Sequence, residues 1–214
     1  MKAKVLMFLF LQMWLVSVYA QSSNDVENQV KVRTELDFQI KLTKGLNLNL
    51  SPELRFADGF DKLLLNGGLT YKTFNFIYWG ASYHLVVDKN STFGSTAYHK
   101  YAFDVTYKDD FGRFTPSFRL RYNNYADEEV YDKEYLRYRA KLSYNIRNCK
   151  LNPYVAVEWV QELDDMMLYK TRYVAGGSYK FNKRSSLSLD YKLDYFNLEY
   201  KNAHILSLGY KHKF

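Results

Sequence analysis

The sequence has one cysteine, three prolines and no long apolar run after its first twenty residues. Cys149 has no partner within the chain, so no internal disulfide can hold the fold together. A membrane-spanning helix needs about 20 predominantly apolar residues. The rest of the chain, with a mean hydropathy of -0.42 overall, offers no such stretch, which excludes helical spans. A membrane β-barrel is not excluded, because its strands alternate between apolar and polar residues.

The first twenty residues have the pattern of a cleaved export signal. Two lysines precede an apolar run over residues 5–16, and Val18-Tyr19-Ala20 supplies small or medium residues three positions and one position before the expected cut. The run is too short for a membrane-spanning helix, and no cysteine at the cut could carry a lipid anchor. We therefore expect residues 1–20 to be removed and residues 21–214 to form one domain.

Positive charge is spread along the chain instead of being clustered. The formal net charge is +7, and removing Lys2 and Lys4 with the signal lowers it by two, to +5. A basic balance raises the question of nucleic-acid binding. An exported chain with dispersed lysines and arginines does not suit that function, so we expect no nucleic-acid partner.

Apolar and polar residues alternate through nearly the whole expected mature chain, which is the period of β-strands. Tyr169, Tyr173, Ala175 and Tyr179, for example, share the apolar face of one strand. The pattern divides into about eleven strands of about ten residues, the length with which a tilted strand crosses a bilayer. Short connections are expected near residues 44, 72, 110, 148 and 183, and longer ones near residues 92, 129, 164 and 199.

An odd number of strands conflicts with the even numbers of single-chain bacterial barrels. Either Asn24 to Val30 forms a short twelfth strand, or the N-terminal segment stays out of the wall and ten strands remain. We predict an all-β fold, a single up-and-down antiparallel transmembrane β-barrel of ten to twelve strands, and favour twelve.

Three features favour a membrane barrel over a soluble barrel or sandwich, whose strands have the same period. The polar faces carry many long charged side chains, as a crowded polar lumen would. The apolar faces place Tyr, Trp or Phe near strand ends, as at a membrane interface. The last strand ends on an aromatic residue, with Tyr210, His212 and Phe214 on its apolar face, and we interpret this as a signal for the outer-membrane assembly machinery. The sequence predicts a monomer in a Gram-negative outer membrane, in contact with lipid and lipopolysaccharide and without a cofactor.

Several short segments carry a family resemblance: Leu136-Arg137-Tyr138-Arg139, Leu151-x-Pro153-Tyr154-Val155 with Glu158, Arg172-Tyr173-x-x-Gly176, Tyr179-x-Phe181-Asn182, Leu208-Gly209-Tyr210 and, earlier, Glu53-Leu54-Arg55-Phe56. In these segments the chain resembles the small outer-membrane barrels of the domain of unknown function 2490 family. The resemblance covers nearly all of the expected mature chain. It implies a barrel fold and an outer-membrane location, and it implies no activity.

The polar faces carry charges of both signs at positions that we expect to point into the lumen. Burying such charges unpaired costs several kcal/mol each, so we expect pairing within one set of residues: Arg55, Glu53, Asp104, Arg119, Arg121, Arg137, Arg139, Lys141, Glu158, Arg172, Asp190 and Asp194. If Arg139 is paired inside, Arg139→Leu should destabilise the barrel. A salt-bridged plug and a basic, anion-preferring pore both suit this set, so the predicted role is structural or a narrow passive pore.

A lipid-modifying enzyme, either a hydrolase or an acyltransferase, is one alternative function. Some small outer-membrane barrels use Ser and His at the rim for such chemistry. Here His84 and His99 flank a loop that contains Ser91 and Ser95, and by parity His84 faces the lumen and His99 faces outward. No nucleophile motif accompanies them, so no catalytic residue is assigned.

A surface role in binding or assembly is the other alternative. Tyrosine-rich loops over residues 125–135 and 195–200 could contact a polysaccharide or a protein partner, although tyrosine is equally expected at a membrane interface. No metal site is expected. His204 and His212 are a strand length apart, and the acidic loops lack the spacing of calcium-binding loops.

Overall fold

The computed structural model describes residues 27–57, 59–90, 94–124, 133–197 and 201–214. The regular elements in these residues are strands, as the alternating pattern predicts. No described helix is long and apolar enough to cross a membrane. The strands are β1 (Glu27–Lys41), β2 (Leu46–Phe56), β3 (Phe60–Lys72), β4 (Ile77–Asn90), β5 (Gly94–Lys108), β6 (Phe114–Asn123), β7 (Tyr135–Tyr144), β8 (Leu151–Glu162), β9 (Leu168–Lys180), β10 (Ser185–Phe196) and β11 (Lys201–Lys213).

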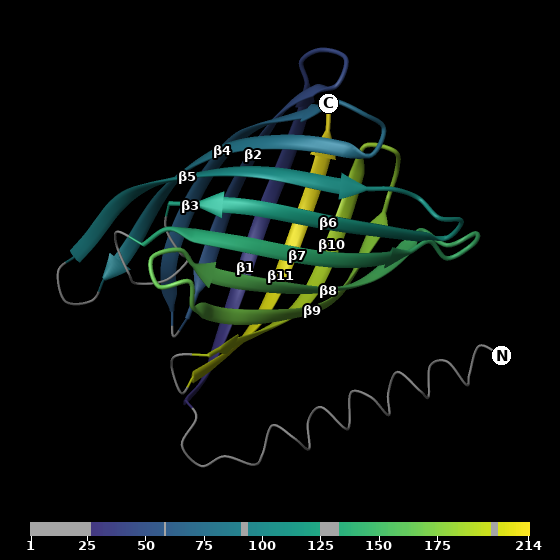
Figure 1. The fold of residues 1–214 in the computed structure, drawn as a ribbon. Coiled ribbons are helices and arrows are strands. Elements are labelled where there is room, and N and C mark those ends of the chain that lie inside the picture. The colour runs from purple at the N-terminus through teal and green to yellow at the C-terminus, as the bar shows by residue number, and fades with distance from the viewer. Residues whose placement is uncertain (1–26, 58, 91–93, 125–132, 198–200) are drawn as a thin grey trace, which may run out of the picture.

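The eleven strands form one closed barrel in which neighbours in sequence pair antiparallel (Figure 1). The barrel is closed by β1 and β11, which run parallel, with Glu27 opposite Lys201 at one end of the pairing and Gln39 opposite Lys213 at the other. This one parallel pair permits an odd number of strands. The eleven described strands lie within the predicted range of ten to twelve, and the favoured number, twelve, is one more than the described chain forms. Residues 27–30 begin β1, and residues 24–26 lie outside the described residues.

The two ends of the barrel differ in what they hold. We call one the turn end: it holds the links that follow the odd-numbered strands and the C-terminus of β11, where Phe214 N donates a hydrogen bond to Gln39 O at 2.9 Å. The opposite end, the loop end, holds the links that follow the even-numbered strands and the beginning of β1 (Figure 1). A link longer than the turns is found there only after β6, over residues 124–134. Beside the other expected long loops the strands extend further than the sequence predicts, since β4 reaches Asn90, β8 reaches Glu162 and β11 begins at Lys201.

Alternation puts one face of every strand outside the barrel and the other inside. The outside is apolar on every strand, as shown by one side chain from each, all between 41% and 57% exposed: Leu36, Leu50, Leu65, Trp79, Phe103, Phe118, Leu142, Val155, Tyr173, Leu189 and Leu206. The inside is charged, and Arg55, Glu158 and Asp194 are buried there. This is the reverse of the distribution in a water-soluble protein, whose charges are rarely buried.

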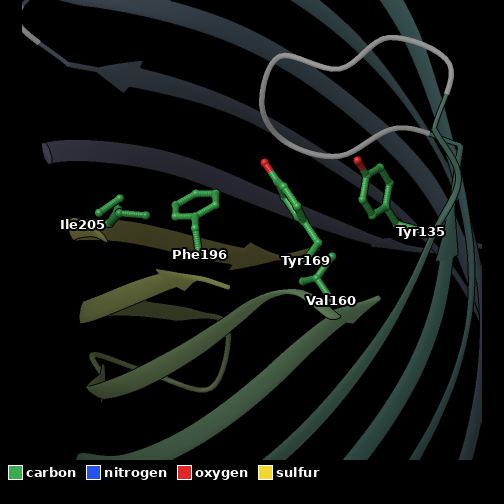
Figure 2. Close-up of a cluster of buried hydrophobic side chains, with 6 residues drawn as sticks. Tyr135, Val160, Tyr169, Phe196 and Ile205 are labelled. Atoms are coloured by element: carbon green, nitrogen blue, oxygen red, sulfur yellow. The ribbon is translucent and has the colours of Figure 1, made fainter. Parts of the chain in front are cut away.

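Near the loop end, six buried apolar side chains occupy part of the interior (Figure 2). The ring of Tyr169 lies 5.5 Å from the rings of Tyr135 and Phe196, measured between centroids. The sequence predicts Tyr169 on the outward face, which is wrong, because a register shift between Val160 and Gln161 interrupts the pairing of β8 with β9. We call these residues the apolar cluster: Tyr135, Val160, Tyr169, Phe196, Ala203 and Ile205.

Candidate functional site

The interior holds a cavity of about 590 Å³ lined by inward side chains of most strands. Its described lining contains ten basic and six acidic side chains, an excess of four positive charges. Low-dielectric walls that carry one sign of charge in excess concentrate ions of the opposite sign. The cavity is therefore the candidate functional site, and its electrostatics favour anions.

The carboxylate of Glu158 lies at the centre of the largest ion-pair network. It is 2% exposed and accepts hydrogen bonds from Arg137 Nη2 at 2.7 Å and from Arg119 Nη2 at 3.2 Å. Arg172 Nη1 lies 3.6 Å from its Oε1 atom. The strand register places Glu158 in β8 directly opposite Arg172 in β9, whereas Arg137 contacts Glu158 from two positions beyond its register partner on β7, Arg139. One buried carboxylate thus compensates three guanidinium groups.

Asp194 is a second, fully buried carboxylate beside the first network. Arg172 donates to it from Nε at 2.5 Å and from Nη2 at 2.7 Å, the two-pronged geometry that makes arginine–carboxylate pairs strong. Lys170 Nζ donates to the same carboxylate at 3.2 Å and lies 5.0 Å from the ring centroid of Phe196. Arg172 therefore links Asp194 to Glu158, and Lys170 connects the charged network to the apolar cluster.

Simpler ion pairs occur on β2 and between β5 and β6. Arg55 Nε lies 2.7 Å from Glu53 Oε1, and both residues are on β2. Arg121 Nη2 lies 2.8 Å from Asp104 Oδ2, a pair that joins β6 to β5. Like the Glu158 network, the Arg121–Asp104 pair holds neighbouring strands together from the inside, whereas the Arg55–Glu53 pair lies within one strand.

A close approach across β9 depends on glycine. Tyr154 in β8 and Asp190 in β10 both lie opposite Gly176, and the Tyr154 hydroxyl donates a hydrogen bond to the Asp190 carboxylate over that glycine. A Cβ atom at Gly176 would lie 2.2 Å from Asp190 Oδ1 and 2.8 Å from the backbone oxygen of Leu189. The Nζ atom of Lys141 lies 3.5 Å above the Tyr154 ring, in a cation–π contact.

The structure brings most of the predicted lumen set together. Nine of the twelve residues form ion pairs: Glu53, Arg55, Asp104, Arg119, Arg121, Arg137, Glu158, Arg172 and Asp194. Asp190 and Lys141 contact Tyr154 instead. Arg139 differs from both groups, because no carboxylate in the described residues lies within 4.0 Å of it and its buried Nε has no hydrogen-bond partner there. The expected pairing of Arg139 is therefore not found in the described chain.

Some charged pairs were not expected from the sequence. At the loop end, Lys62 Nζ lies 2.8 Å from Asp88 Oδ2, and Lys133 is paired with Glu162. The hydrogen bond to Glu162 raises the pKa of Lys133. Asp88, Lys133 and Glu162 fall in segments that the sequence predicts as loops, and strand alternation alone does not say which residues of different strands become neighbours.

The predicted assembly signal lies on the outward face of β11 at the turn end. The ring of His212 lies 6.5 Å from that of Tyr210 and 4.6 Å from that of Phe214, measured between centroids. Phe214 also approaches Phe38 of the closing strand β1, at 6.4 Å. These three residues therefore form one aromatic row beside the parallel pair of strands.

His84 and His99 do not meet. His84 lines the cavity, whereas His99 is exposed on the outward face, where its Nδ1 contacts the Tyr83 hydroxyl. Ser91 and the side chain of Ser95 lie outside the described parts of the chain. A rim site formed by these histidines and serines therefore has no support in the described residues.

His84 instead belongs to a hydrogen-bonded row that the sequence analysis missed. Its Nε2 atom lies 3.0 Å from Ser82 Oγ and its Nδ1 atom lies 2.5 Å from Asn66 Oδ1. Ser82 and His84 are two residues apart on β4, and Asn66 faces His84 across the β3–β4 pair. The Ser-x-His spacing was a visible signal, but Asn66 joins it only through the register. No group of three or more described His, Cys, Asp or Glu residues is placed to hold a metal ion.

One protein family matches this chain over most of its length. The family is described as protein of unknown function (DUF2490), and its model covers residues 30–204, from within β1 to within β11. No curated protein matches the chain. The match agrees with the resemblance carried by the short sequence segments, and it assigns no activity.

Proposed function

We propose, from the premise that the chain belongs to the domain of unknown function 2490 family, that it is an integral β-barrel protein of a Gram-negative outer membrane. The observation that carries this proposal is the continuous apolar outer face, to which all eleven strands contribute exposed large side chains. Apolar patches of that extent are rare on soluble monomers. A closed barrel satisfies its backbone hydrogen bonds internally and can therefore enter a bilayer.

Aromatic residues at the turn end support the same placement. Phe74, Phe76, Phe111, Phe114 and Phe181 are all exposed there, and the Phe74 and Phe76 rings stack at 5.9 Å. Transmembrane barrels carry such aromatic girdles at the level of the lipid headgroups. The export signal and the aromatic last strand that we expect from the sequence point to the outer membrane.

Within the membrane, we propose a structural barrel whose lumen is at most a narrow passive conduit for small anions. Barrels of this strand number have little free interior, whereas open porins need about 16 strands. The buried ion pairs of Glu158 and Asp194 line the inner wall from β6 to β10, and the apolar cluster occupies part of the interior near the loop end. The positive excess of the cavity lining would favour anions in the remaining space.

Conductance of the refolded protein, without residues 1–20, in a planar bilayer tests this proposal. We expect small openings that select anions over cations, and we expect Phe196→Ala, which shortens a side chain of the apolar cluster, to enlarge them. Phe181→Ala, at an exposed position of the turn end, is the matched control and should leave conductance unchanged. Silence from both the parent and Phe196→Ala would contradict a conduit and leave the structural role. Failure of the native protein to fractionate with outer membranes would overturn the placement.

A second candidate function, ester hydrolysis, is favoured by the row formed by Ser82, His84 and Asn66. If His84 Nδ1–H donates a hydrogen bond to Asn66 Oδ1, then His84 Nε2 carries no proton and can take the proton of the Ser82 hydroxyl, which is the nucleophile–base–orienter arrangement of serine hydrolases. The Ser82 oxygen would attack the ester carbonyl and form an acyl-serine, and the leaving alkoxide would take the proton that His84 received from Ser82. Water would then lose a proton to His84 and bond through its oxygen to the acyl carbon, which releases the acid and returns the proton to Ser82. The three residues line the positive cavity, so the substrate would be a small anionic ester.

A fluorophosphonate probe, which bonds to activated serines, tests the hydrolase candidate. The refolded barrel should be labelled, and both Ser82→Ala and His84→Gln should abolish the label. Ser188 also lines the cavity but donates to the backbone oxygen of Gly209. Ser188→Ala should therefore keep the label. Equal labelling of the Ser82→Ala variant would eliminate this candidate.

A further inference from the structure

Four arginines form a square on the inner wall of the barrel. Arg119 and Arg121 on β6 lie directly opposite Arg139 and Arg137 on β7. All four line the cavity. Like charges directly opposite each other across a strand pair are destabilising, so this arrangement disfavours the folded barrel unless negative charge compensates it.

The carboxylates of the described residues compensate this arginine square only in part. Glu158 forms ion pairs with Arg137 and Arg119, but it also lies near Arg172, which belongs to another strand. Asp104 forms an ion pair with Arg121. Glu158 and Asp104 thus form the ion pairs of Arg119, Arg121 and Arg137, Glu158 is shared with Arg172 outside the square, and neither carboxylate lies within 4.0 Å of Arg139.

Some N–H donors of the arginine square also lack a hydrogen-bond partner in the described residues. The buried Nε atoms of Arg119, Arg121 and Arg139 have no hydrogen-bond partner in the described residues. Buried polar groups are normally hydrogen-bonded, so each exception needs an explanation. Arg139 is the least satisfied of the four, because no described carboxylate lies within 4.0 Å of it either. Uncompensated guanidinium charge and N–H donors without a hydrogen-bond partner therefore occur at the same place and face the same cavity.

We propose that the arginine square is a binding site for one small tetrahedral oxyanion of the phosphate class, held chiefly by Arg139 and Arg119. Guanidinium forks match phosphate oxygens with parallel hydrogen bonds, which chloride cannot accept in the same way. The cavity of about 590 Å³ has room for such an ion or for a small phosphate monoester. The site needs only the folded barrel, so it goes beyond the proposed function and does not depend on conduction.

Calorimetric titration of inorganic phosphate into the refolded protein, in zwitterionic detergent at low salt, tests the site. We expect saturable binding of one phosphate. Arg139→Gln should weaken it about tenfold or more, equivalent to about 1.4 kcal/mol. Glu158→Gln should strengthen it, because it removes the carboxylate that competes for Arg119. Arg147→Gln, in the exposed turn between β7 and β8, is the matched control and should bind as the parent does. A titration with a small phosphate monoester then distinguishes a free phosphate ion from a phosphorylated ligand.

Stability without phosphate supplies an independent check. Because Arg139 is uncompensated, Arg139→Gln should leave the phosphate-free barrel at least as stable as the parent, and phosphate should stabilise the parent more than the variant. Absence of binding, or equal affinity in the parent and Arg139→Gln, would overturn the proposal. The measurement is made in detergent, so a protein that binds phosphate but does not conduct would contradict only the conduit.

Discussion

Glu158→Gln is expected to destabilise the folded barrel by about 3–5 kcal/mol, the usual effect of removing one partner from a buried ion pair. The substitution keeps the size of the side chain and removes only the charge. It leaves Arg137 and Arg119 without the carboxylate that both contact, at a position where Glu158 is 2% exposed. Urea unfolding of the barrel in lipid vesicles, followed by the different gel mobility of folded and unfolded forms, measures the change.

Two further variants separate charge compensation from packing. Asp165→Asn, at an exposed position between β8 and β9, should change the unfolding free energy by less than about 0.5 kcal/mol. Adding Arg137→Gln to Glu158→Gln should restore part of the lost stability, because it removes one uncompensated charge. If Glu158→Gln were as stable as the parent, the network would contribute nothing to holding the strands together.

Gly176→Ala is expected to cost about 2–3 kcal/mol, the upper part of the range for overpacking a well-filled interior. The added Cβ would overlap both the Asp190 carboxylate and the backbone of β10. A carboxylate can rotate away, but doing so breaks its hydrogen bond with Tyr154, and the backbone can move only by disturbing the β9–β10 pair. The same unfolding measurement applies.

Gly67→Ala is the control for this substitution. A Cβ at Gly67 would meet nothing closer than the end of the Leu50 side chain at 3.8 Å. Since glycine weakens a strand through its flexibility in the unfolded chain, Gly67→Ala should be neutral or slightly stabilising. Equal losses in the two variants would mean that the close approach over Gly176 has no special role.

Local alternation was enough to predict the strands, their faces and the inward position of the charged set. Each of these depends only on neighbours two residues apart, and that is the information a strand pattern holds. The same reasoning placed His84 inside and His99 outside. It failed at Tyr169, where the register shift at Val160 and Gln161 changes the face without a local sequence signal.

Closure and partner choice could not be predicted, because both depend on register between strands. The parallel pairing of β1 with β11 brings together residues from the two ends of the chain, and no local pattern encodes it. Predicting ion pairs between neighbouring strands, such as that of Arg121 with Asp104, requires the same knowledge of strand register. Arg139 illustrates the consequence. From the sequence, Arg139→Leu is predicted to destabilise the barrel if Arg139 is paired. In the structure no described carboxylate pairs with Arg139, so removing its charge is expected not to lower the stability of the barrel.

The parallel closing pair also orders the events of folding. Lys211 Nζ bonds Asp37 Oδ2 at 2.7 Å across this pair, although 174 positions separate the two residues in the chain. Hairpins such as β2–β3 join near neighbours and can form early, since their loop-closure entropy is small. The pairing of β1 with β11 closes a loop of almost the whole described chain, and this entropic cost is met most easily once the intervening strands are in place. The circle is therefore completed last, and until then β1 and β11 each present an open edge, to which an assembly factor or an incoming strand could pair.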